Sequence, residues 1–80
     1  MNAKQAVARR IQELSAQYNL TVNALATRCG VSPSTIYSML NTKSKNPGVV
    51  TIQKLCDGLG ISMRTFFDST LFEALDPEIK

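Results

Sequence analysis

Two short stretches of helical periodicity meet at a tight corner, Gly30-Val31-Ser32-Pro33. Gly30 suits the left-handed conformation that ends many helices, because it has no Cβ atom. Ser32 offers a hydroxyl that can cap a helix N-terminus, and Pro33 suits the first position of a helix. The pattern therefore predicts that one helix ends at Gly30 and that another begins at Pro33.

Apolar residues recur at spacings of three and four along most of the chain, as on one face of a helix. No segment has the alternation of a β-strand, and there is no internal repeat. The predicted helices cover 3–18, a short segment between an N-cap at Thr21 and Gly30, then 33–41, 49–59 and about 63–69. The predicted inward residues are Val7, Ile11, Leu14 and Tyr18; Val22, Leu25, Ala26 and Cys29; Ile36, Met39 and Leu40; Val49, Ile52, Leu55, Cys56 and Leu59; and Phe66 with Phe67.

A chain of 80 residues buries only about 60–65% of its unfolded surface, which is enough for one modest core. We therefore expect one compact all-α domain over residues 1–69 and a short acidic tail over 70–80. Leu71, Phe72 and Leu75 of this tail either cover the edge of the core or form a dimer contact.

The charge is unevenly distributed along the chain. Residues 1–64 carry eight Lys and Arg and two acidic residues, a net charge of +6, whereas residues 65–80 carry −3. A basic body is compatible with a polyanionic partner, although charge alone indicates this weakly. Arg9 and Arg10 are either solvated or within reach of a phosphate.

The residues needed for most catalytic and metal sites are missing. The sequence has no histidine, and Cys29 and Cys56 stand 27 residues apart without a Cys-x-x-Cys pair. Both cysteines fall on apolar stripes and are predicted to be buried free thiols. No glycine-rich phosphate loop, transmembrane stretch or signal peptide is present. We expect a cytoplasmic protein that is not an enzyme, with no catalytic residue, metal, cofactor or small-molecule ligand.

The stretch 11–67 resembles the Cro/C1-type (XRE) helix-turn-helix family, which includes phage-repressor DNA-binding domains. The matching residues are Leu20-Thr21, Leu25-Ala26, Cys29-Gly30-Val31-Ser32, Ser34-Thr35-Ile36, Asn41, Pro47, Leu55 and Leu59-Gly60-Ile61-Ser62. The resemblance implies a compact five-helix repressor-like domain, in which helices 2 and 3 form the helix-turn-helix. It also implies binding to double-stranded operator DNA, usually as a homodimer.

The resemblance further implies which residues face DNA. The base-facing positions of the recognition helix are Pro33, Ser34, Thr35, Tyr37 and Ser38. The phosphate-facing positions are Thr21, Val22 and Asn23 at a helix N-terminus, and Asn41, Thr42, Lys43, Ser44, Lys45 and Asn46 after the recognition helix. Tyr37 either reaches DNA or packs on the Lys43 stem.

The sequence departs from the family pattern at two places. Leu40 stands where the family commonly has a Glu paired with a basic residue of helix 1, and Ser15 is the residue expected to face it. The recognition face also has no Gln, Arg or Asn, the side chains that bind guanine or adenine with two hydrogen bonds. Direct base discrimination is therefore expected to be modest, resting on hydroxyls, the Thr35 methyl and Tyr37.

The sequence thus predicts a sequence-specific DNA-binding transcriptional regulator that acts as a repressor. The alternative is a protein-interaction module, such as an antitoxin-like partner or an adaptor, that uses the same helical face. An acyl-carrier protein, suggested by Asp68-Ser69, is not expected, because few residues follow the serine and because the body is basic.

Overall fold

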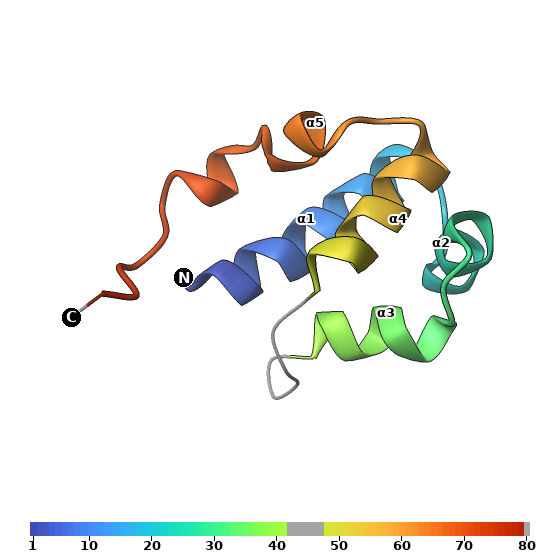
Figure 1. The fold of residues 1–80 in the computed structure, drawn as a ribbon, viewed down its shortest axis with the longest axis horizontal. Helices are drawn as coiled ribbons and strands as arrows, with labels where there is room; N and C mark the ends of the chain where they lie inside the picture. The colour runs from blue at the N-terminus through green and yellow to red at the C-terminus, as the bar shows by residue number, and fades with distance from the viewer. Residues whose placement is uncertain (42–47, 80) are drawn as a thin grey trace.

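The computed structural model describes residues 1–41 and 48–79 of the chain, and within them every regular element is helical. The elements are α1 (Ala3–Gln17), α2 (Val22–Cys29), α3 (Pro33–Leu40), α4 (Val49–Leu59), α5 (Met63–Phe67) and the 3-10 turn η1 (Thr70–Phe72). In Figure 1, α3 runs along one edge of the molecule and α5 along the opposite edge, with α1 and α4 between them. The predicted all-α five-helix fold is confirmed.

Local capping explains where the helices begin and end. The hydroxyls of Thr21, Ser32 and Ser62 each accept a hydrogen bond from a backbone N–H three residues ahead, as an N-cap does. Gly30 and Gly60 end α2 and α4 in the left-handed conformation, with φ of 69° and 71°. The caps at Thr21 and Ser32 and the helix end at Gly30 are the ones that the sequence predicts.

One core joins all five helices. Its largest fully buried side chains are Phe66, Ile11, Leu25, Ile36, Leu55 and Cys56. Tyr18, Leu40 and Phe72 are partly buried against it, and the Phe72 ring lies 4.9 Å from that of Phe67. Phe72 therefore covers the edge of the core, one of the two roles predicted for it. Within residues 1–41 and 48–79, no helix has the length and apolar character needed to cross a membrane.

Two predicted core positions are wrong. Val49 is 65% exposed and Phe67 is 40% exposed. Both line an open groove with Ala3 and Val7 of α1, and no described segment fills it. Periodicity assigned these residues to the correct helix faces, but those faces extend beyond the part of the core that neighbouring helices cover.

The predicted fifth helix is also too long, since α5 ends at Phe67 and not near residue 69. Ser69 starts a separate turn, because its hydroxyl accepts the Leu71 N–H at 3.3 Å. The last carbonyl groups of α5 are bound instead by Arg10 of α1, whose Nε donates to Phe66 O at 2.6 Å and whose second guanidinium nitrogen donates to Thr65 O at 2.9 Å. Arg10 thus has a structural role, which neither of its predicted alternatives anticipated.

Helices α2 and α4 approach each other closely at Gly58. A Cβ atom at position 58 would clash with Cys29 Sγ and would lie 2.6 Å from Cys29 Cα. The Gly58 carbonyl also accepts a hydrogen bond from Arg28 Nε at 2.9 Å. Glycine has a low helix propensity, but the close approach of α2 requires a glycine at position 58.

Candidate nucleic-acid interface

The helix-turn-helix is formed by α2, the Gly30–Ser32 turn and α3. After Gly30 ends α2 in the left-handed conformation, the Val31 N–H donates to Ala26 O at 3.0 Å, which holds the turn against the end of α2. Ser32 then begins α3, with Pro33 in its first turn. Since backbone and side-chain hydrogen bonds define both ends of the turn, the angle between the two helices is set locally.

Packing holds α3 on α2. Ala26 and Ile36 are completely buried, and Leu25 is nearly so. Because Ala26 has no exposed surface, a larger side chain at this position would separate the two helices. Helix α3 also contacts α1, so two elements support its inner face.

The other face of α3 is open to solvent. Pro33, Ser34, Tyr37 and Ser38 are exposed, and Thr35 is half-buried. Tyr37 is the large side chain of this face, with 55% of its surface exposed. The five predicted base-facing residues therefore lie together on one helix, opposite the buried side chains of Ile36 and Met39.

Three hydroxyl groups form a cluster at the start of α3. Ser32 Oγ lies 3.1 Å from Ser34 Oγ and 2.8 Å from Thr35 Oγ1, and it accepts the Thr35 N–H at 3.3 Å. The sequence predicts Ser32 only as a cap, although the Ser-x-Ser-Thr run was the available signal for a cluster. Two of the predicted base-facing hydroxyls are thus already hydrogen-bonded within the protein.

The predicted phosphate-facing residues of α2 differ in what they can offer. Thr21 Oγ1 accepts the Ala24 N–H at 3.1 Å, and Val22 is half-buried against the core. Asn23 is exposed. Since the first N–H groups of a helix have no partner within it, the backbone here can donate to an anion without any charged side chain.

Of the predicted phosphate-facing residues after α3, the structure describes Asn41. Asn41 ends α3 and is exposed. The other predicted contacts lie outside the described residues; they are Thr42, Lys43, Ser44, Lys45 and Asn46.

Two arginines of the basic body connect helices through side-chain hydrogen bonds. Arg10 connects α1 to α5, and Arg28 binds the Gly58 carbonyl while its guanidinium carbon lies 6.0 Å from the centre of the Tyr18 ring. Both bonding partners are distant in sequence, so the sequence contains no signal for them. Arg9, by contrast, is exposed. The hydrogen bonds therefore fix the positions of the Arg10 and Arg28 side chains, whereas no such bond is seen for Arg9 among the described residues.

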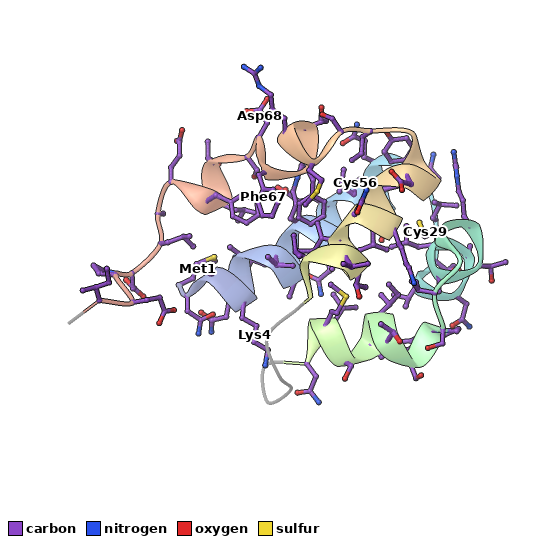
Figure 2. The ribbon with its side chains drawn as sticks, viewed as in Figure 1. Met1, Lys4, Cys29, Cys56, Phe67 and Asp68 are labelled. Atoms are coloured by element: carbon purple, nitrogen blue, oxygen red, sulfur yellow. The ribbon has the colours of Figure 1, made fainter. Side chains whose placement is uncertain are left out.

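The two cysteines lie in the packed interior of the protein. Cys29 and Cys56, on the packed helices α2 and α4, are free and buried, as the sequence predicts (Figure 2). Burial raises the pKa of each thiol above its ordinary value of 9.0, with the Arg28 charge partly opposing the effect at Cys29. Both thiols are therefore protonated at neutral pH, and a protonated thiol is a poor nucleophile. The residues that the structure describes contain no group of three His, Cys, Asp or Glu side chains able to hold a metal ion.

Comparisons with known proteins agree with this geometry. Residues 10–69 match the family model described as the Cro/C1-type HTH DNA-binding domain. A solved structure titled "Crystal structure of the prophage Lp1 protein 11" is similar, with 41% sequence identity and a TM-score of 0.78. The match covers 86% of this chain and 92% of that one. A search of curated proteins found no match.

Proposed function

Because this chain belongs to the Cro/C1-type helix-turn-helix DNA-binding domain family, we propose that it is a sequence-specific transcriptional regulator. In this proposal it acts as a repressor, by occupying an operator with α3 in the major groove. The family supports the DNA-binding part of the proposal directly.

The observation that carries the proposal is the exposed, uncharged face of α3, on a helix buried on its other side against α1 and α2. The DNA major groove is about 12 Å wide and admits one α-helix. Small side chains at Ser34 and Ser38 would allow the helix backbone to approach the base edges closely. A face without carboxylates also avoids repulsion from phosphates.

Phosphate contacts would orient α3 in the groove. We assign them to the N-terminus of α2 over Thr21–Asn23, where N–H groups and the helix dipole favour an anion. Asn41 and the following residues 42–46, with Lys43 and Lys45, would bind further phosphates. Such contacts position the protein but do not read sequence.

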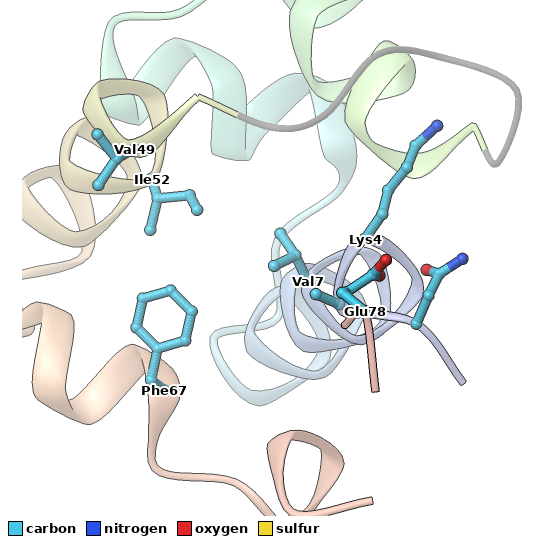
Figure 3. A pocket seen from close by; sticks show the side chains of 8 residues that line it. Lys4, Val7, Val49, Ile52, Phe67 and Glu78 are labelled. Atoms are coloured by element: carbon cyan, nitrogen blue, oxygen red, sulfur yellow. The ribbon is translucent and has the colours of Figure 1, made fainter. Parts of the chain in front are cut away.

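A homodimer would place two copies of α3 in successive major grooves, about 34 Å apart. The groove between α1, α4 and α5 is the surface that we assign to the second copy (Figure 3). Val49 and Phe67 give it an apolar lining, and Lys4 and Glu78 provide both charge signs around it. A two-fold interface needs a surface that is complementary to itself, and an apolar lining flanked by charges of both signs is compatible with that requirement.

Selection from random duplex DNA, followed by fluorescence anisotropy at two salt concentrations, tests the proposal. We expect an enriched inverted repeat whose affinity falls steeply as salt rises. Lys43→Ala should weaken binding to every duplex and reduce the salt slope by about one, while Lys54→Ala on α4 should have little effect.

Weak, salt-sensitive binding without an enriched sequence would contradict the proposal. That result would favour the alternative, in which the Ser34, Tyr37 and Ser38 face binds a protein partner. The neutral character of this face is the observation that supports the alternative.

A further inference from the structure

The exposed face of α3 holds two parallel stripes of different chemistry. Residues four apart lie one above the other on a helix. Pro33 and Tyr37 therefore form an apolar stripe, and Ser34 and Ser38 form a hydroxyl stripe beside it. All four residues are exposed. A DNA groove that receives this face would meet an apolar strip and a hydroxyl strip side by side.

The hydroxyls at the start of α3 have limited capacity to read bases. Each hydroxyl has one proton to donate, and the two hydrogen bonds that join Ser32 to Ser34 and Thr35 use two of the three protons. The cluster retains one donor, together with lone pairs that accept single hydrogen bonds. No side chain of α3 has the two donors that a bidentate contact to guanine needs, or the donor and acceptor that a bidentate contact to adenine needs.

The apolar stripe has a specific counterpart in DNA. Among the groups that base pairs present in the major groove, the thymine 5-methyl is the apolar one. Tyr37 provides a half-exposed ring, and Pro33 extends it by one helical turn. A turn rises about 5.4 Å, which compares with about 3.4 Å between neighbouring bases of one strand. The stripe is therefore long enough to touch the methyl groups of two neighbouring thymines.

We propose that the Pro33–Tyr37 stripe packs on thymine 5-methyl groups in each operator half-site and that this contact is the main source of sequence preference. This inference rests on the proposed operator-binding function and identifies the base that the operator must contain. In this inference Tyr37 is the residue that determines specificity, because its ring is the large side chain of the stripe and is 55% exposed.

Replacing thymine by deoxyuracil tests the inference, because it removes only the methyl group. The probe is the highest-affinity duplex from the selection, with each dT of one half-site changed to dU in turn, bound to the full chain. We expect one or two positions at which the dissociation constant rises about fourfold, the equivalent of about 0.8 kcal/mol per methyl. Tyr37→Ala should abolish this penalty, whereas Tyr37→Phe and Ser38→Ala should retain it.

The outcomes separate this inference from the function on which it rests. If a duplex is selected and bound specifically, but dU is neutral at every position, the thymine contact is wrong while operator binding stands. A dU penalty that survives in Tyr37→Ala would contradict the role of Tyr37. Failure to enrich any sequence would overturn both proposals. Since Tyr37 is exposed, its variants should fold normally, which circular dichroism checks.

Discussion

Replacing Gly58 by Ala tests the close packing of α4 against α2. The added Cβ atom would clash with Cys29 Sγ and would lie 2.6 Å from Cys29 Cα. The Cα atom belongs to the backbone of α2, so a change of side-chain rotamer cannot relieve this contact. Helices α2 and α4 would have to move apart, and this would disturb the helix that supports α3.

Two opposing effects determine the size of the change. Alanine in a helix interior is favoured over glycine by about 1 kcal/mol. Overpacking a core costs typically about 1–3 kcal/mol and occasionally more, and a backbone contact belongs at the upper end. We therefore expect Gly58→Ala to lower the free energy of unfolding by about 2 kcal/mol. For a domain of this size, that corresponds to a fall in Tm of roughly 8–16 °C.

Urea denaturation and thermal melting followed by circular dichroism measure this change. Asp57→Ala, at the exposed neighbouring position in α4, is the control and should alter stability by less than about 0.5 kcal/mol. Adding Cys29→Ala to Gly58→Ala should restore only part of the loss, since the contact with Cα remains. A Gly58→Ala protein as stable as the wild type would refute the close approach of α2 and α4.

The hydrogen bonds from Arg10 to α5 should contribute to stability. Arg10→Gln should lower the free energy of unfolding by about 2 kcal/mol in urea titrations, because charge-assisted hydrogen bonds to two carbonyl groups are lost. Arg9→Gln is the control and should be nearly neutral; equal effects of the two substitutions would contradict this role of Arg10. Above pH 9.0 the free energy of unfolding should fall, because the cysteine thiols ionise in the unfolded chain while the buried thiols of the folded chain stay protonated. The fall should be up to about 1.4 kcal/mol per pH unit for each thiol. Cys56→Ala should reduce this dependence in denaturation series at several pH values, and an unchanged slope would argue against it. Val49→Glu places a charge in the proposed dimer groove, so sedimentation should show one protein molecule bound per operator duplex. Thr27→Glu on α2 is the control and should still show two protein molecules per duplex. Two molecules per duplex for both variants would place the dimer contact elsewhere.

The helix boundaries could be predicted because their signals are local. Thr21 and Ser32 cap helices through bonds to residues three positions ahead, and Gly30 ends α2 through its own conformation. Each of these requires only a few neighbouring residues to be identified. The same locality made the helix-turn-helix visible in the sequence and placed five predicted base-facing residues on one helix. Their contact with DNA is still a prediction.

The remaining features depend on contacts between distant parts of the chain. Val49 and Phe67 lie on apolar faces, yet periodicity does not tell how far along a helix its neighbours extend. Arg10 and Arg28 are charged residues whose donors bind carbonyl groups of other helices. Gly58 has a low helix propensity, but its packing against α2 becomes evident only in three dimensions. In each case the relevant partner is separated by about 30 residues or more, beyond the reach of a local pattern.

The central claim is that the outer face of α3 is the DNA-binding surface. The most direct test is to titrate the selected duplex into isotope-labelled protein and follow the backbone amide signals by NMR. The account predicts that the largest shifts fall on Ser34–Ser38 and on Thr21–Asn23, with smaller shifts around Val49 and Phe67, where a second copy would pack. Shifts concentrated on α5, with the signals of α3 unchanged, would contradict it.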